Sequence, residues 1–250
     1  MKLVFDLDGT ICFKGKPLSE SMVQVLDIAV KKGHEIIFAS ARPIRDLLPV
    51  LPPHMQRYSM VGGNGAFVAI AGNIVSTIHF DQWIADTIIS LITEYEADYL
   101  IDSQWDYAYS GSNEHPIRRN VDPEQRAKNI HLLELNEIVK VVILYSHHKD
   151  QLLEELQKLP IVTYIHGDEG IVDISPTGVD KWVGLQRIGV EAQQFIAFGN
   201  DANDVSMFKH AHRSICVGEH ECLLQLATDQ VSNIEDQVVE KIMKLLEEIH

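Results

Sequence analysis

Residues 4–10, Val-Phe-Asp-Leu-Asp-Gly-Thr, constrain the fold of this chain more than any other stretch. The apolar residues before Asp6 are typical of a buried strand, and Gly9 and Thr10 mark the turn that ends it. Side chains alternate along a strand, so Asp6 and Asp8 project from the same side if the chain stays extended. Two ionised carboxylates this close repel each other, and a cation that takes oxygen ligands, such as Mg²⁺, would stabilise them. The alternative is a strand that simply ends in an acidic turn.

The chain has 250 residues, which predicts either one large α/β domain or a core with a sizeable insert. Its 21 basic and 36 acidic residues give a formal net charge of −15. Binding nucleic acid or an anionic membrane requires positive charge, so neither is expected as a partner. A small phosphorylated substrate remains compatible with this charge, because a metal ion and one or two cationic side chains can reverse its sign locally.

Cysteine usage and hydropathy favour a cytoplasmic protein. Cys12, Cys216 and Cys222 are odd in number and lack C-x-x-C spacing, which fits a reducing compartment better than a disulfide framework. The apolar run before Asp6 is too short for a signal peptide, and no stretch approaches the ~18 uninterrupted apolar residues of a membrane helix. The sequence is compatible with a monomer or a homodimer.

Apolar strands alternate with amphipathic helices at both ends of the chain. A helix expected to begin near Ser19 separates the first two strands, and Pro43 is placed to open another. This β-α-β order predicts a doubly wound, Rossmann-like parallel sheet with right-handed connections. The strands expected in it are residues 3–5, 35–39, 58–61, 194–198 and 214–217.

The alternation breaks in the middle of the chain. The elements expected there are helix 83–96, strands 99–102, 107–110 and 139–145, helix 150–159, and strands 162–165 and 170–174. Such an order is typical of an α+β unit. We therefore predict a core domain made of residues 1–80 and 179–250, with an α+β cap domain of residues 81–178 inserted into it.

Four polar clusters follow apolar strands or open helices of the predicted core. In an open α/β sheet the carboxyl ends of the strands face one crevice, so clusters far apart in the sequence can converge there. The clusters are Asp6 with Asp8, Ser40 with Arg42, Lys181, and Asn200 with Asp201 and Asp204.

These clusters resemble, in order, the four motifs of the haloacid dehalogenase superfamily. The matching segments are Asp6-Leu7-Asp8-Gly9-Thr10, Ser40 in Ala-Ser-Ala-Arg, Lys181 in Gly-Val-Asp-Lys, and residues 199–207, Gly-Asn-Asp-Ala-Asn-Asp-Val-Ser-Met. Asn64-Gly65-Ala66 and the insert after the third core strand look like the Cof-type branch of the superfamily, with a type IIB cap. The resemblance covers the whole chain and implies a phosphatase that uses Mg²⁺.

The residue types support the same chemistry. A carboxylate can attack phosphorus to give an aspartyl-phosphate, which splits one difficult displacement into two easier ones, and Asp6 is the expected nucleophile. Asp8 would protonate the leaving alkoxide and then accept a proton from water. Lys181 would supply a cation and Ser40 a hydroxyl to the phosphoryl oxygens. Ser40 is also in a position to cap a helix.

Mg²⁺ would bridge Asp6 and the phosphate, with a backbone carbonyl near Asp8 and a side chain of the late loop completing its oxygen shell. The superfamily usually has aspartate after the loop glycine, whereas this chain has Asn200 there, followed by Asp201. Either Asn200 is a neutral ligand or Asp201 serves in its place. Asp204 is the last candidate at the metal, where it would orient the metal's waters or Lys181.

The remaining candidates are expected to contact the substrate; they are Gly9, Thr10, Ala41, Arg42, Gly63, Asn64 and Asn203. The superfamily often has arginine at the position of Arg42, where a structural or cap-facing role is the alternative. Residues 62–65, Gly-Gly-Asn-Gly, lack a full G-x-G-x-x-G and lead into a hairpin whose turn is expected at Gly72-Asn73. A loop near the substrate is therefore favoured over a dinucleotide-binding loop.

The sequence thus predicts a Mg²⁺-dependent phosphatase that hydrolyses a small phosphorylated metabolite, expected to be a sugar phosphate. A phosphomutase would use the same chemistry, with a substrate hydroxyl in place of water. The alternative from another class is a phosphoacceptor signalling domain or a binding module with little turnover. Such a module needs neither a lid nor the acid at Asp8.

Overall fold

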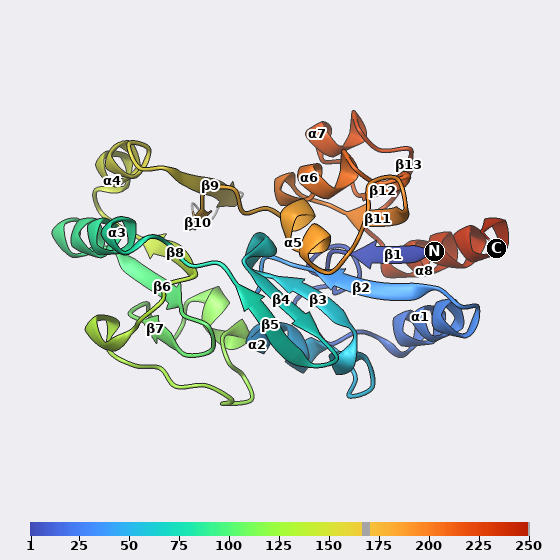
Figure 1. Cartoon of the computed structure of the whole chain (residues 1–250), viewed down its shortest axis with the longest axis horizontal. Coiled ribbons are helices and arrows are strands. Elements are labelled where there is room, and N and C mark those ends of the chain that lie inside the picture. Colours follow the sequence, from blue (N-terminus) through green and yellow to red (C-terminus); the bar gives the residue numbers. More distant parts are fainter. Residues whose placement is uncertain (167–170, 250) are drawn as a thin grey trace. The chain divides into compact units, whose positions relative to one another are not determined.

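The computed structural model describes residues 1–166 and 171–249, which form two compact units (Figure 1). Met1–Val75 and Asp180–His250 make up the core unit, and Ser76–Val179 make up the inserted unit. The sequence analysis places the boundaries at residues 80 and 178. The assignment of these units as a catalytic core and its cap stays a prediction.

The core unit is built on a sheet of eight strands within the described residues, in the order β13-β12-β11-β1-β2-β3-β4-β5. The sheet is parallel from β13 to β3, and β4 runs antiparallel to β3. This arrangement confirms the predicted doubly wound α/β core. The strands are β1 (Lys2–Phe5), β2 (Glu35–Ala39), β3 (Ser59–Gly62), β4 (Phe67–Ile70), β5 (Asn73–Thr77), β11 (Phe195–Gly199), β12 (Arg213–Val217) and β13 (Asp229–Val231).

β1 lies near the middle of this sheet and is buried on both faces. Val4 packs with Trp182 of helix α5 (Lys181–Arg187) in one apolar cluster. Leu3 and Phe5 point to the opposite face because side chains alternate along a strand, and both are fully buried. Burial on two faces explains why the strand is a continuous apolar run rather than an alternating one.

The helices of the core unit begin at the signals seen in the sequence. Ser19 is the N-cap of α1 (Glu20–Lys31), and its side chain accepts a hydrogen bond from the backbone N–H of Met22 at 3.2 Å. Pro43 directly precedes α2 (Ile44–Leu47). The other α-helices of this unit are α6 (Val205–Phe208), α7 (Glu221–Leu224) and α8 (Glu235–Glu248). Within the described residues, no helix is both long enough and apolar enough to cross a lipid bilayer.

Two details of the core unit differ from the sequence expectations. The hairpin between β4 and β5 turns at Ala71 and Gly72, whose φ angles are 53° and 84°, one residue earlier than the expected Gly72-Asn73 turn. Strand β13 is also not predicted from the sequence. This edge strand has three residues, of which only Val231 is apolar, so it carries no periodic signal.

The inserted unit contains a sheet with the strand order β7-β6-β8-β10-β9 in the part of the chain that is described, and its pairings are antiparallel. The predicted α+β character of the insert is confirmed by this sheet and its two helices. Gly170, where the sequence analysis begins the last strand, lies outside the described residues. The strands are β6 (Asp98–Asp102), β7 (Tyr107–Tyr109), β8 (Lys140–Tyr145), β9 (Ile161–His166) and β10 (Ile171–Pro176).

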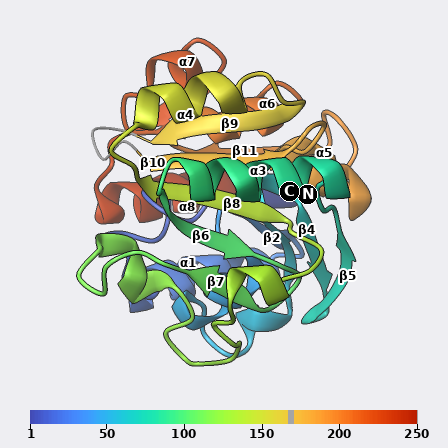
Figure 2. The ribbon, with the colours of Figure 1, turned by 90° about the vertical axis from the view of Figure 1, so that its left-hand side faces the viewer.

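Helices α3 (Gln82–Glu94) and α4 (Lys149–Leu156) cover one face of this second sheet (Figure 2). Ile88 of α3 and Leu152 of α4 belong to the same apolar cluster as Val141 of β8. The neighbouring residues of β8 point to the other face, where a smaller cluster is buried. The inserted unit therefore has its own hydrophobic core.

Candidate active site

Asp6 directly follows β1, and its backbone N–H donates to the carbonyl of Phe198 in β11 at 3.0 Å. A tight turn comes next, in which Gly9 has a φ of 80° and its N–H donates to Cys12 O at 2.9 Å. A Cβ at Gly9 would collide with the side-chain amide of Asn200. Glycine therefore permits both the turn and the close approach of the last polar cluster to the first.

A buried cluster of one cation and two carboxylates forms the centre of the candidate site. Lys181 Nζ lies 2.6 Å from Asp6 Oδ1 and 2.6 Å from Asp204 Oδ1. Lys181 and Asp204 are fully buried, and Asp6 is 5% exposed. Lys181 is the first residue of α5, whose N-cap Asp180 accepts a hydrogen bond from Val183 N at 2.9 Å. With all three groups ionised the cluster has a net charge of −1, so a further cation would stabilise it.

The environment of this cluster shifts the pKa values of its members. Burial raises the pKa of Asp6 to about 7; Lys181 acts to lower it and Asp204 to raise it. Burial acts to lower the pKa of Lys181, but the carboxylates of Asp204 and Asp6 outweigh it and raise that pKa above its usual value. At neutral pH, Lys181 therefore keeps its proton while Asp6 takes up and releases one. Positive charge placed near Asp6 favours its ionised, nucleophilic form.

Asp204 organises the late loop as well as Lys181. Its Oδ2 accepts the backbone N–H groups of Asn200 at 2.8 Å and Asp201 at 3.1 Å, while its Oδ1 contacts Lys181. The loop continues into the 3-10 turn Ala202–Asp204, which Asp201 and Asp204 close with a reciprocal capping box. Both carboxylate oxygens of Asp204 thus have partners within the chain. Its predicted role in orienting Lys181 matches this geometry, and its role at a metal stays a prediction.

Asn200 and Asp201, the two alternatives for the late-loop ligand, have different partners in the structure. Thr10 Oγ1 lies 2.9 Å from Asp6 Oδ2 and 3.1 Å from Asn200 Oδ1, so the amide oxygen of Asn200 and a carboxylate oxygen of Asp6 share this hydroxyl as a neighbour. Asp201 Oδ1 instead accepts the N–H of the next residue at 2.7 Å, and His220 Nε2 lies 3.6 Å from it. Asn200 is therefore better placed than Asp201 to share a cation with Asp6.

The residues around Thr10 fit a cation with oxygen ligands. Asp6 Oδ2 and Asn200 Oδ1 both approach the Thr10 hydroxyl, which has only one proton to donate. A carboxylate and an amide oxygen are donors that Mg²⁺ accepts. Within the described residues, no group of three or more His, Cys, Asp and Glu side chains is arranged to hold a metal ion. The two oxygen atoms at the Thr10 hydroxyl come from one charged and one neutral side chain, and their binding of Mg²⁺ stays a prediction.

Asp8 has a different partner from Asp6. Arg42 Nε donates to Asp8 Oδ2 at 2.7 Å, and Arg42 Nη2 donates to Asp8 Oδ1 at 2.5 Å, which makes a bidentate ion pair. The side chain of Asp8 is 47% exposed and that of Arg42 is 12% exposed. The role of Arg42 was left open by the sequence, which does not predict this contact. Nothing in the spacing of the two residues signals it, because they come together only through the pairing of β1 with β2.

Ser40 and Ala41 follow β2 and lead to Arg42. Ser40 Oγ accepts the backbone N–H of Arg42 at 3.1 Å, and the residue is 1% exposed. The hydroxyl thus closes a local turn, as in the capping alternative, and still has a proton to donate. Ala41 is half-buried between the two. Contact of these residues with a phosphate or a substrate stays a prediction.

Gly63, Asn64 and Asn203 lie in the interior of the core unit. Asn203 Nδ2 donates to Asn64 Oδ1 at 3.0 Å, and Asn64 is fully buried with a φ of 56°. The sequence analysis placed all three near the substrate but did not anticipate that two of them bond to each other. This bond joins the side chains of Asn64 and Asn203, and the contact of all three residues with a substrate stays a prediction.

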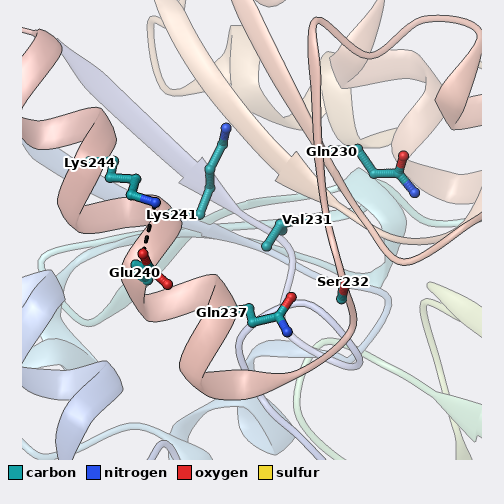
Figure 3. A pocket seen from close by; sticks show the side chains of 7 residues that line it. All are labelled: Gln230, Val231, Ser232, Gln237, Glu240, Lys241 and Lys244. Carbon is teal, nitrogen blue, oxygen red and sulfur yellow. Dashed lines mark ion pairs between the residues drawn. The ribbon is translucent and has the colours of Figure 1, made fainter.

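A polar pocket of about 570 Å³ lies between β13 and α8 (Figure 3). Its cations are paired, since Lys244 lies 2.7 Å from Glu240 and Lys241 pairs with Asp229. None of the predicted site residues lines it. It is lined by Gln230, Val231, Ser232, Gln237, Glu240, Lys241 and Lys244.

Two known proteins of similar sequence share most of their length with this chain. A family model of haloacid dehalogenase-like hydrolases matches residues 3–244. The chain is 22% identical over 267 aligned residues to the 5-amino-6-(5-phospho-D-ribitylamino)uracil phosphatase YitU of Bacillus subtilis, with 97% of this chain and 96% of that protein covered. It is 26% identical over 226 residues to a phosphoglycolate phosphatase of Methanosarcina mazei, with coverage of 86% and 82%.

Solved structures share the fold over nearly the whole chain. A haloacid dehalogenase-like hydrolase from B. subtilis superposes with a TM-score of 0.81 at 19% identity, covering 98% of this chain and 100% of that one. A structure described as a subclass IIB sugar phosphatase of the superfamily gives 0.80 at 17% identity, covering 99% of each chain. The predicted superfamily, fold class and phosphatase type of hydrolase are confirmed. The chain belongs to the haloacid dehalogenase-like hydrolases.

Proposed function

We propose that the chain is a Mg²⁺-dependent phosphatase that hydrolyses a small phosphorylated metabolite through a phosphorylated Asp6. The observation that carries this proposal is the buried cluster in which Lys181 Nζ lies 2.6 Å from both Asp6 and Asp204. Asp204 holds Lys181, and Lys181 holds Asp6 at the carboxyl end of the central strand. A fixed cation beside a fixed nucleophile is what phosphoryl transfer requires most.

The reaction has two displacement steps. In the first, a carboxylate oxygen of Asp6 bonds to phosphorus, the bond between phosphorus and the ester oxygen breaks, and Asp8 donates a proton to the leaving alkoxide. In the second, water bonds to phosphorus, Asp8 accepts a proton from it, and the bond between phosphorus and Asp6 breaks. The products are an alcohol, inorganic phosphate and the free Asp6 carboxylate. Lys181 and the Ser40 hydroxyl hold the phosphoryl oxygens in both steps.

The proposed ligands of Mg²⁺ are Asp6, Asn200 and the backbone carbonyl of Asp8. When bound, Mg²⁺ supplies charge neutralisation at the phosphoryl group and keeps Asp6 ionised. Thr10 orients the side-chain oxygens of Asp6 and Asn200 through its hydroxyl, because both oxygens lie within 3.1 Å of Thr10 Oγ1. Asp204 acts through Lys181 and through the loop amides rather than as a first ligand.

The proposed substrate is a sugar phosphate. One relative is named for a substrate with a phosphoribityl group, and one structural neighbour is described as a sugar phosphatase. The net charge of −15 speaks against nucleic acid and anionic membranes as partners. A cytoplasmic location is proposed from the free Cys12, Cys216 and Cys222, and a monomer and a homodimer are both compatible with the fold.

The test is release of inorganic phosphate from an aryl phosphate by the wild type, by Asp6→Asn and by Asp236→Asn. Asp236 is an exposed residue in the first turn of α8, so its variant controls for the loss of one carboxylate. We expect metal-dependent release by the wild type and the control, abolished by EDTA and by Asp6→Asn. Release that persists in EDTA or in Asp6→Asn would refute the mechanism.

The same preparation tests the alternatives. A phosphomutase would move label between positions of a sugar phosphate without releasing phosphate. A phosphoacceptor module would accumulate protein-bound phosphate, stable to acid quench, and release little. Once turnover is established, a panel of sugar phosphates together with phosphoglycolate would identify the substrate.

A further inference from the structure

The turn Gly62–Gly65 contacts the loop that carries Ser40 and Arg42. The backbone N–H of Gly63 donates to Arg42 O at 2.8 Å, and that of Asn64 donates to Ser40 O at 3.0 Å. Both residues of the second motif are therefore held through their carbonyl groups. The position of the Ser40 hydroxyl depends on these bonds, because they fix the backbone on which it sits.

The same turn packs against the start of helix α5. Gly65 has a φ of 110°, and a Cβ at this position would overlap the carbonyl group of Asp180. Asp180 is the N-cap residue directly before Lys181. The backbone of the turn thus lies against the residue that starts the Lys181 helix, at a distance that only glycine permits.

A third contact joins the turn to the late loop. Asn64 Oδ1 accepts a hydrogen bond from Asn203 Nδ2 at 3.0 Å, and the two residues are 0% and 6% exposed. Asn203 directly precedes Asp204, whose carboxylate holds Lys181. Asn64 adopts a left-handed φ of 56°, a backbone conformation that costs free energy for a residue other than glycine. Glycine would avoid that cost but would lack the amide oxygen.

We propose that Asn64 is a positioning residue that ties the late loop to the Ser40 loop and to the Lys181 helix. Its backbone N–H bonds to the Ser40 loop, and its side chain bonds to the late loop. The turn that contains it packs against the start of the Lys181 helix. Through these contacts it sets the spacing of Ser40, Lys181 and Asp204 around Asp6. The kinetic consequence of this role rests on the proposed phosphatase function, whereas the structural consequence does not.

The kinetic test is a double-mutant cycle between Asn64→Gly and Asn203→Ala. Asn64→Gly permits the same left-handed backbone and removes the side chain that accepts the bond from Asn203, and Asn203→Ala removes the donor of that bond. A displacement of about 1 Å can cost on the order of 100-fold in rate, so each variant should lower kcat by about 10- to 100-fold and leave KM nearly unchanged. The double variant should lose no more than the worse single one, because both remove one interaction.

A matched control is Gln193→Gly. Gln193 is an exposed residue of the core unit with a φ of 62°, so this variant also places glycine at a left-handed position but touches none of the site segments. We expect wild-type kcat and KM for it. An increase in KM without a loss of kcat in Asn64→Gly would indicate direct contact with the substrate and overturn the proposal. The proposal would also be overturned if the loss of kcat in the double variant equalled the product of the losses in the two single variants.

Amide hydrogen exchange provides a readout that needs no activity. In Asn64→Gly we expect faster exchange than in the wild type at residues 180–184 and 200–204, and no change there in Gln193→Gly. Equal exchange in Asn64→Gly and the wild type would overturn the proposal. If the wild type releases no phosphate, the proposed function fails and the exchange data alone decide the role of Asn64.

Discussion

Replacing Lys181 by methionine tests whether the buried cluster is the organising element of the site. Methionine keeps most of the aliphatic length of lysine and removes its charge. The carboxylates of Asp6 and Asp204, each 2.6 Å from Lys181 Nζ, then lose their cation while they remain buried. Removal of one partner from a buried ion pair generally costs about 3–5 kcal/mol, because the other charge is left uncompensated.

The structure sets a ceiling on this cost. Asp6 already has a pKa of about 7, so its protonation at pH 7 in the variant adds little. Asp204 must be buried as a lone charge or take up a proton. Protonation at pH 7 of an aspartate that titrates near ~3.9 in the unfolded chain costs about 4 kcal/mol. We therefore expect Lys181→Met to lower the free energy of unfolding by about 3–4 kcal/mol at pH 7.

The pH dependence of this loss has a definite sign. As the pH falls below neutral, the folded variant can relieve its uncompensated buried charge by taking up a proton that the unfolded chain does not bind. The unfolding free energy of the variant therefore rises, relative to the wild type, as the pH falls. The loss should shrink by about 1.4 kcal/mol for each pH unit, to roughly 1 kcal/mol near pH 5.

Urea unfolding in EDTA between pH 5 and pH 8 measures this effect. Trp182 reports on the core unit, because it stacks on Phe195 with ring centroids 5.7 Å apart. Trp83 and Trp105 belong to the inserted unit and are replaced by phenylalanine in every variant compared.

Two further variants make the result decisive. Lys244→Met removes an exposed lysine that pairs with Glu240 on α8, and it should leave stability almost unchanged. Adding Asp204→Asn to Lys181→Met should recover most of the loss, since the amide oxygen still accepts the loop N–H groups. A loss below about 1 kcal/mol that does not change with pH would refute the reasoning, because the cluster would then carry no uncompensated charge.

Three further predictions concern the metal and the acid–base group. The raised pKa of Asp6 predicts that Mg²⁺ binding releases a proton below pH 7. The apparent affinity for Mg²⁺ should therefore rise about tenfold per pH unit up to pH 7 and then level off. Calorimetry in buffers of different ionisation enthalpy measures both the affinity and the released proton. In the same experiment, Asn200→Ala should weaken Mg²⁺ binding by about 10-fold or more, and Asp201→Ala should weaken it less. A larger loss of affinity in Asp201→Ala than in Asn200→Ala would contradict the proposed role of Asn200 as a ligand. Arg42→Lys should lower kcat by about 10-fold, because lysine cannot reproduce the bidentate bond to Asp8. A kcat equal to that of the wild type would show that Arg42 does not position Asp8.

Local features of this protein were readable from the sequence because they depend on neighbouring residues. Strand β2 occupies Glu35–Ala39, as expected from its apolar run, and Ser19 caps α1 as its position before an apolar stripe predicts. Each polar cluster lies at a strand end or a helix start, so the topology of a parallel sheet was enough to predict that the clusters converge. The edge strand β13 was missed because three residues without an apolar pattern carry no period.

The partners of the side chains were decided only by the tertiary structure. Arg42 and Asp8 meet although 34 positions separate them, and Asn64 and Asn203 meet across 139 positions. Such contacts depend on strand register and on the direction in which each loop leaves the sheet, which no local period encodes.

Asn200 and Asp201 show that side-chain partners also cannot be predicted from the sequence for two neighbouring residues. The two are neighbours in the sequence, and the capping box between Asp201 and Asp204 turns Asp201 toward the 3-10 turn. The Asn200 amide then lies beside Thr10 and Asp6. The sequence by itself determined the fold class and the groups of residues that lie together in the candidate site. The packing of the loop decided which oxygen within a group faces Asp6, because that depends on hydrogen bonds formed only in the folded chain.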